Sequence, residues 1–262
     1  MTRVLSGAVL LVLAIAAVWL ASAPVFFLVA EALLVLAFTE YVELARANGV
    51  AVPAIPAGIA AMSTAAAFAR PGGGISIEVV LMSAFAVLAV MTMVQWRGGP
   101  DALGHSAAAV LPSLYLGLPI GAMIAIRDAR GREVLFLLML TVFVSDTAQY
   151  YTGRAFGRRP LAPRISPKKT IEGAVGGFVF GALLMVVAGA YWLPAVPLLA
   201  RAVIGVLIVA LGIAGDLFES MLKRSARVKD SSSLIPGHGG VLDRIDALLF
   251  AAPVYYIVLK YV

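Results

Sequence analysis

The chain has 262 residues, of which 62% are hydrophobic and 13% are charged, and it contains no Cys. Soluble domains carry about 25% charged and about 45–50% apolar residues, so this composition excludes a disordered chain and argues against a water-soluble globule. The absence of Cys excludes disulfides, thiolate nucleophiles and Cys-type metal sites. The net charge is +6, but in a chain with few charges the position of each one is more informative. We therefore expect an all-α, polytopic transmembrane helical bundle.

Apolar runs separated by short breaks that carry Gly, Pro or Arg predict about nine membrane spans. In chain order their expected ranges are 4–20, 24–45, 51–69, 75–94, 107–126, 134–153, 171–193, 197–219 and 241–262. The first run follows Arg3 and is also compatible with the apolar region of a cleavable signal. No small-x-small cleavage site precedes the next span, so we interpret the first run as a membrane helix.

Basic residues are distributed unequally between the two sides that nine spans define. The N-terminal side holds Arg3, Arg46, Arg97 and the basic loops at 154–169 and 223–229. The opposite side holds scattered basic residues, which are Arg70, Arg127, Arg130, Arg132, Arg201 and Lys260. Because basic loops stay cytoplasmic, we expect the N-terminus and both basic loops to face the cytoplasm. An error of one early span would invert the N-terminus but would leave both loops on a common side.

The two halves of the chain differ in where their polar residues lie. Before residue 146 the breaks are short and their charges scattered, whereas polar residues cluster at span ends and in two loops after it. The chain has no visible internal repeat, which argues against repeat-built transporter folds. We expect an N-terminal scaffold half at 1–133 and a C-terminal working half at 134–262.

The first polar cluster lies at the end of the sixth expected span. Spacings of three, four and seven place Asp146, Gln149, Tyr150 and Gly153 on one helical face. A charged residue inside a span is a functional candidate by default, because it is costly without a partner. The alternative is a polar seam that joins two helices.

The second cluster is the segment 166–173, which follows the arginines at 154, 158, 159 and 164. Ser166 is a suitable N-cap and Pro167 a suitable first helical residue, so we expect Lys168, Lys169 and Thr170 in the first turn of the seventh span. A helix N-terminus with two lysines predicts a phosphate site. The arginines are better explained as anchors at the lipid headgroups, an alternative that remains open for the lysines.

The third cluster lies at the end of the eighth expected span. Asp216, Glu219, Ser220 and Lys223 share one helical face, which places two carboxylates, a hydroxyl and an ammonium in a single stripe. Internal pairing of the acids with Lys223 is the structural alternative.

The fourth cluster is the segment 236–246 at the start of the ninth expected span. Its glycines allow a tight turn and a close approach to phosphate, and Asp243 and Asp246 project from one side of the first helical turn. The two acids could instead compensate the helix dipole. His238 fits a donor to phosphate or an organiser of the loop better than a catalytic base.

Together the clusters predict chemistry on phosphates. Cations that face the cytoplasm indicate a polyphosphate, and carboxylates from two separate helices, Asp216 with Asp243 and Asp246, indicate a divalent cation. Mg²⁺ characteristically uses one or two carboxylates together with substrate phosphate oxygens. We therefore expect phosphoryl or nucleotidyl transfer at the membrane surface. The only histidines are His105 and His238, and no Ser/His/Asp arrangement competes.

The residues from 220 to 246 resemble the signature of the phosphatidate cytidylyltransferases (CDP-diacylglycerol synthases). The matching positions are Ser220, Leu222, Lys223, Arg224, Lys229, Asp230, Ser232, Ile235, Pro236, His238, Gly239, Gly240, Val241, Asp243, Arg244, Ile245 and Asp246. The segments 166–173 and 215–220 also resemble family motifs, in the same order. One departure is that relatives commonly have Asp-Thr-Gly-Ala-Tyr where this chain has Ala148 and Gln149 between Thr147 and Tyr150.

The resemblance implies transfer of a cytidylyl group from CTP to phosphatidic acid, giving CDP-diacylglycerol and pyrophosphate in phospholipid biosynthesis, with Mg²⁺ required. It implies an inner-membrane protein whose active site faces the cytoplasm, a lipid substrate drawn from the inner leaflet, and a homodimer. We expect no nucleic-acid partner. The residues expected to act in catalysis are Asp216, Lys223, Asp243 and Asp246, and those expected to bind the metal are Asp216, Asp243, Asp246 and Asp146. The residues expected to bind substrate are Ser166, Lys168, Lys169, Thr170, Ser220, Arg224, Lys229, Asp230, His238, Gly239 and Gly240.

Two other functions remain to be weighed. The phosphatidyl-group transferases that consume CDP-diacylglycerol also combine membrane helices, Mg²⁺ and aspartates, but their Asp-Gly-x2-Ala-Arg-x8-Gly-x3-Asp-x3-Asp pattern is absent. A cation-coupled or anion transporter would carry its carboxylates near the bilayer midplane and not mainly at cytoplasmic span ends.

Overall fold

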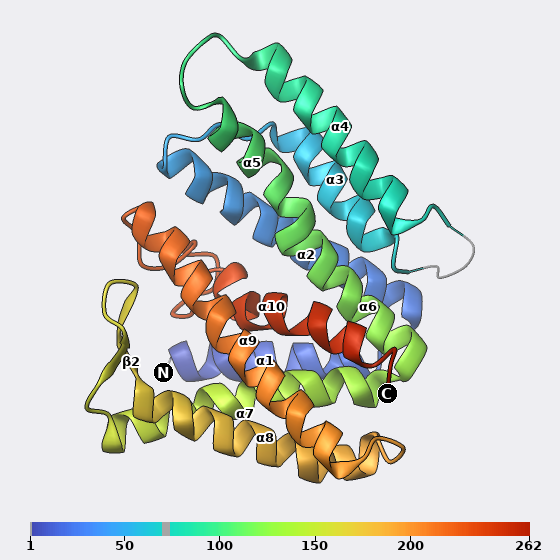
Figure 1. Ribbon diagram of the computed structural model, residues 1–262, viewed down its shortest axis with the longest axis vertical. Coiled ribbons are helices and arrows are strands. Elements are labelled where there is room, and N and C mark those ends of the chain that lie inside the picture. Colours follow the sequence, from blue (N-terminus) through green and yellow to red (C-terminus); the bar gives the residue numbers. More distant parts are fainter. Residues whose placement is uncertain (1, 70–73) are drawn as a thin grey trace.

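The computed structural model describes residues 2–69 and 74–262, so Arg70 lies outside the described residues. The N-terminal helices are α1 (Thr2–Trp19), α2 (Ala23–Ala47), α3 (Ala54–Ala66) and α4 (Ile77–Gln95). They are followed by α5 (Ala102–Pro112), a π-helical turn η1 (Ser113–Gly117) and α6 (Leu118–Arg130). The remaining elements are α7 (Arg132–Phe156), β1 (Pro160–Ala162), β2 (Ser166–Thr170), α8 (Ile171–Trp192), α9 (Leu198–Ser225) and α10 (Leu242–Val258). The expected helical bundle is confirmed, with the addition of one small hairpin (Figure 1).

The expected count of about nine spans is not supported. Among the described residues, the helices long and apolar enough to cross a membrane number six, which are α2, α4, the continuous helix Ala102–Arg130, α7, α8 and α9. The three expected spans that fall short are the first, whose apolar helix is Ser6–Trp19, α3 with 13 residues and α10 with 17. A helix needs about 20 residues to cross a hydrocarbon core at a rise of 1.5 Å per residue. The expected ranges were too long because the loop residues that flank these shorter helices are also apolar.

The expected start of the helix at Ser166 is wrong. Ser166 and Pro167 belong to strand β2, which pairs with β1 in antiparallel register, with Ala162 opposite Ser166 and Pro160 opposite Thr170. Thr170 is the N-cap of α8, and its Oγ1 accepts a hydrogen bond from the Gly173 backbone N at 3.1 Å. Lys168, Lys169 and Thr170 therefore precede the helix instead of lying in its first turn. Pairing with a segment upstream in the chain overrode the local capping signal.

Glycines bring helix α8 close to α7. A Cβ added at Gly176 would lie 2.2 Å from Thr152 Oγ1, and one added at Gly177 would lie 2.5 Å from Gln149 Cγ. Apolar side chains gain little by leaving lipid, so membrane helices associate mainly through close packing of their backbones. Small residues at the interface make that close packing possible. The close packing fixes the end of α7, where Asp146 lies, against the start of α8.

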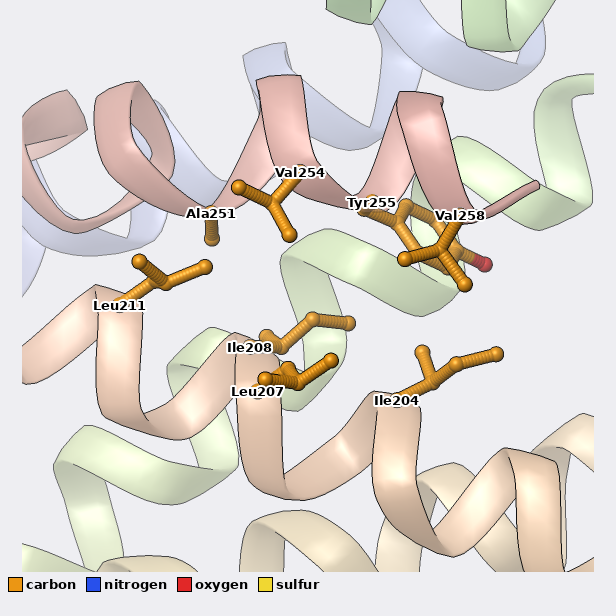
Figure 2. A pocket seen from close by; sticks show the side chains of 8 residues that line it. All are labelled: Ile204, Leu207, Ile208, Leu211, Ala251, Val254, Tyr255 and Val258. Carbon is orange, nitrogen blue, oxygen red and sulfur yellow. The ribbon is translucent and has the colours of Figure 1, made fainter. Parts of the chain in front are cut away.

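Helices α9 and α10 form the second pair that positions the polar clusters (Figure 1). Along most of their contact the facing side chains are apolar. Figure 2 shows these side chains around a small gap between the helices, and they are Ile204, Leu207, Ile208, Leu211, Ala251, Val254, Tyr255 and Val258. Farther toward the C-terminus of α9 the backbones approach closely, since a Cβ added at Gly215 would lie 2.4 Å from the Asp246 carbonyl oxygen. This approach places Asp216 beside the first turns of α10.

Candidate active site

The hairpin and helix α9 meet through an ion pair between Lys169 and Asp216. Lys169 Nζ contacts Asp216 Oδ2, and Ser220 Oγ donates to Asp216 Oδ1 at 3.2 Å. Strand geometry explains the choice of lysine, because successive side chains point to opposite faces. Lys168 is exposed, whereas Lys169 is partly buried. The structure therefore brings together Lys169, Asp216 and Ser220, as expected, but through a strand instead of a helix.

Lys223 joins helix α9 to helix α10. Its ammonium contacts Glu219 Oε2 within α9 and Asp243 Oδ1 at the start of α10. Lys223 is 8% exposed and Glu219 is fully buried. The internal pairing that the sequence offered as the structural alternative therefore occurs, and Lys223 also fixes Asp243. The catalytic role of Lys223 stays a prediction.

Asp243 organises the loop that precedes α10. Its Oδ2 accepts hydrogen bonds from the Ser231 backbone N at 2.9 Å, the Ser231 hydroxyl at 2.8 Å and the Gly240 backbone N at 2.7 Å. Burial alone would raise the pKa of Asp243, but the bond from Lys223 and those from the Gly240 and Ser231 backbone lower this pKa to about 2. Asp243 is therefore a firmly ionised group, and most of its acceptor capacity is used inside the protein.

Asp246 has a different environment from Asp243. Its Oδ1 accepts from the Ala247 backbone N at 2.7 Å. Burial, and then the negative charge of Asp216, raise the pKa of Asp246 to about 7. Asp146 also interacts electrostatically with Asp216 and with Lys169. Asp146, Asp216 and Asp246, which come from three helices, thus interact electrostatically with one another.

The glycines before α10 leave room for carboxylates of the protein itself. Gly237 and Gly239 have φ near +77°, and Ile235 and Gly239 pair in an isolated bridge that closes the turn. A Cβ added at Gly239 would lie 2.5 Å from Asp243 Oδ2. One added at Gly240 would lie 2.3 Å from Glu40 Oε2. The sequence correctly indicated a tight turn and a close approach, but the groups approached in this structure are Asp243 and Glu40.

His238 lies against helix α1. Its Nδ1 is 2.8 Å from Ser6 Oγ, which also donates to the Pro236 carbonyl oxygen at 3.0 Å. The His238 backbone N donates to the Ile235 carbonyl oxygen at 2.9 Å. These contacts correspond to the loop-organising role among the two that the sequence left open.

The outer basic residues surround the hairpin and the loop. Arg224 is exposed, and its Nε donates to the Ile165 carbonyl oxygen at 3.4 Å, which links α9 to the turn of the hairpin. Lys168, Lys229 and Asp230 are exposed side chains. The structure thus places these residues at the rim of the carboxylate cluster and not inside it.

The departure at Ala148 and Gln149 has a local explanation. Gln149 Nε2 donates to Asp146 Oδ1 at 3.0 Å and lies 3.2 Å from Ser145 Oγ. Its side chain also packs where Gly177 provides space. Gln149 therefore orients Asp146, which an alanine at this position could not do.

Sequence reasoning gave no role to Glu40. This residue lies on α2, far from the signature segment in the chain, yet its carboxylate contacts the loop before α10. An acidic residue within the second expected span was the available signal, because buried charges in such segments need partners. Glu219 was given no catalytic or metal role in the sequence, only pairing with Lys223 as the structural alternative, and the structure shows that pairing.

The carboxylates around Asp216 offer a small set of oxygen ligands for a metal ion. Within residues 2–69 and 74–262, no group of three or more His, Asp or Glu side chains is arranged to hold a metal by itself. Burial is the main cause of the raised pKa of Asp246, and the negative charge of Asp216 raises it further, so the two carboxylates interact. Mg²⁺ commonly takes one or two carboxylates and completes its shell with water and substrate phosphate. Two neighbouring carboxylates, Asp216 and Asp246, are a donor set compatible with a cation of that kind.

The comparisons with known proteins agree in one family. The cytidylyltransferase family model matches residues 1–262. A phosphatidate cytidylyltransferase of Bacillus subtilis is 34% identical over 189 residues, covering 71% of this chain and 69% of its own. One of Aquifex aeolicus is 40% identical over 125 residues, covering 48% of this chain and 46% of its own. One of Haemophilus influenzae is 44% identical over 130 residues, covering 48% of this chain and 45% of its own. The matched region thus spans less than half of the last two relatives.

The family match extends over the whole chain and includes every element of the site. The helices that carry the carboxylates, the hairpin that carries Lys169 and the N-terminal helix that carries Glu40 all lie inside it. The chain belongs to the cytidylyltransferase family.

Proposed function

We propose that this protein transfers a cytidylyl group from CTP to phosphatidic acid, forming CDP-diacylglycerol and pyrophosphate. One observation carries the proposal: Asp216 and Asp246 from two helices, together with Lys169 from the hairpin, form one polar cluster in a chain of the cytidylyltransferase family. Relatives named phosphatidate cytidylyltransferase support this choice of substrates.

The proposed reaction is a direct displacement at phosphorus. An oxygen of the lipid phosphate attacks the α-phosphorus of CTP and forms the new P–O bond. The bond from that phosphorus to the bridging oxygen of the β-phosphate breaks, and pyrophosphate leaves with the electron pair. No covalent enzyme intermediate is required. The main obstacle is repulsion between two polyanions, so positioning and charge neutralisation supply most of the rate.

The chain's own residues would divide this work. Lys169 and Arg224 would hold phosphates, and Ser220 would assist beside Asp216. Lys223 would keep Asp243 in place and compensate its charge. Lys168, Lys229, Asp230 and His238 would contact the triphosphate from the rim or order the loop there. Asp216 and Asp246 would bind Mg²⁺, with Asp243 and Asp146 as further contributors. When bound, the metal neutralises charge on the transferring phosphate.

The proposed setting is the cytoplasmic side of the inner membrane. Both basic segments, the hairpin at 160–170 and the end of α9, carry the cations that favour this side. Phosphatidic acid would enter sideways from the inner leaflet and keep its acyl chains in apolar surroundings. The homodimer implied by the resemblance stays a prediction.

Pyrophosphate release tests the proposal. The purified protein in detergent is expected to release pyrophosphate from CTP only after phosphatidic acid is added, and EDTA is expected to abolish the release. Each of the other nucleoside triphosphates serves as a comparison. A transporter would release no pyrophosphate, so absence of lipid-dependent release would contradict the proposal.

A further inference from the structure

Glu40 brings the N-terminal half of the chain into contact with the α9–α10 loop, which comprises residues 226–241. Its carboxylate lies on α2 and is 5% exposed. Oε1 accepts from Ser232 Oγ at 2.7 Å and from the Val241 backbone N at 2.9 Å. Oε2 accepts from Ser231 Oγ at 2.8 Å and from the Leu242 backbone N at 2.8 Å. Four donors from both ends of the loop thus converge on one carboxylate.

Two of these donors belong to the start of α10. The first backbone N–H groups of a helix have no partner within the helix, so they need an acceptor from elsewhere. The N-cap residue of α10 is Val241, and its apolar side chain provides no such acceptor. Glu40 supplies the acceptor from a different helix, and a carboxylate at this end also interacts favourably with the helix dipole. The position of α10 therefore depends on α2.

Ser231 connects Glu40 to the carboxylate cluster. Its hydroxyl lies 2.8 Å from Glu40 Oε2 and 2.8 Å from Asp243 Oδ2, so one hydroxyl is shared by two carboxylates. The space is tightly filled, since a Cβ added at Gly240 would lie 2.1 Å from Ser231 Oγ. A shift of Glu40 would therefore displace Ser231 and, with it, Asp243.

We infer that Glu40 is a positioning residue: through Ser231 it holds Asp243, and through the first amides of α10 it fixes the helix that carries Asp246. Its consequence for turnover and metal use rests on the proposed function, whereas its hold on the loop does not. The inference makes the N-terminal half part of the site's supporting shell and not only a scaffold in the membrane.

The decisive variant is Glu40→Gln, with Glu43→Gln as the matched control. Gln keeps the shape of Glu, but its NH2 group is a donor and replaces one of the accepting oxygens. It would therefore face the backbone N–H of Val241 or Leu242, and two donors cannot form a hydrogen bond with each other. Glu43 lies one helical turn further along α2, and its carboxylate forms an exposed pair with Arg46. Hydrogen exchange of the whole protein in detergent reports on the loop independently of turnover.

We expect Glu40→Gln to accelerate exchange at the amides of Val241 and Leu242 but not in the middle of α8. We also expect the Mg²⁺ concentration for half-maximal activity to rise, and turnover to fall, by about 10–100-fold, as is usual when a residue supporting a metal ligand is lost. Glu43→Gln should leave all three measurements unchanged. Unchanged exchange at Val241 and Leu242 in Glu40→Gln would overturn the inference.

A milder pair of variants covers the case in which Glu40→Gln unfolds the protein. Ser231→Ala removes only the shared hydroxyl, and Ser233→Ala removes an exposed hydroxyl of the same loop. Ser231→Ala is expected to raise the Mg²⁺ requirement and loop exchange, and Ser233→Ala to change neither. Identical behaviour of the two serine variants would overturn the inference. If the wild-type protein shows no lipid-dependent turnover, the proposed function fails, and the exchange measurement alone decides on Glu40.

Discussion

Lys223→Met tests how much the buried ion pairs of Lys223 contribute to the stability of the protein. Lys223 is the ammonium that contacts both Glu219 and Asp243, and the Glu219 side chain is 0% exposed. Removing one partner of a buried ion pair costs about 3–5 kcal/mol, because the remaining charge has no compensation. For a chain of this size that corresponds to a fall of roughly 6–20 °C in the thermal unfolding midpoint. Lipid-dependent pyrophosphate release should be lost as well.

The assay is thermal unfolding in detergent, with two companion variants. Lys223→Met combined with Glu219→Gln removes the unpaired buried charge, so it should recover a large part of the lost midpoint but none of the turnover. Arg46→Met is the matched control, because the Arg46–Glu43 pair is exposed and such pairs contribute about 0–1 kcal/mol. A Lys223→Met midpoint equal to that of the wild type, or no recovery in the double variant, would refute the reasoning.

Three further predictions concern single contacts. Asp243→Asn should abolish turnover while the protein remains folded and inserted, because the amide cannot pair with Lys223; near-normal activity would remove Asp243 from the site. Lys169→Ala should raise the Michaelis constant for a phosphate-bearing substrate about tenfold, the effect of one charge-assisted hydrogen bond, and unchanged constants for both substrates would refute that role. Gly240→Ala should lower stability by about 1–3 kcal/mol in thermal unfolding, since its Cβ would lie 2.1 Å from Ser231 Oγ; an unchanged midpoint would show that the loop can relax.

Local patterns in the sequence predicted the helices that carry the site. Asp216, Ser220 and Lys223 share a face of α9 as their spacing requires. Apolar composition located the helices themselves, but it overestimated the number of spans because α3, α10 and the apolar part of α1 are short. The shared face on α9 and the location of the helices depend only on interactions within one helix or one apolar run.

Contacts between distant segments could not be predicted in the same way. Ser166 and Pro167 carry a strong helix-start signal, but pairing with β1 places them in a strand. Glu40 and Ser231 are separated by 191 positions, and nothing local to either residue indicates the contact. The glycines at 239 and 240 indicated a close approach, but only the fold shows that they approach carboxylates of the protein.

Transfer of label from CTP into lipid is the most direct test of the central claim that the Asp216, Asp246 and Lys169 cluster is a cytidylyltransferase site. With CTP labelled at the α-phosphate, we expect label in the lipid fraction only when phosphatidic acid and Mg²⁺ are present. Asp216→Asn should abolish this incorporation while the protein stays folded. Absence of labelled lipid with the wild-type protein, or full incorporation by Asp216→Asn, would contradict the account.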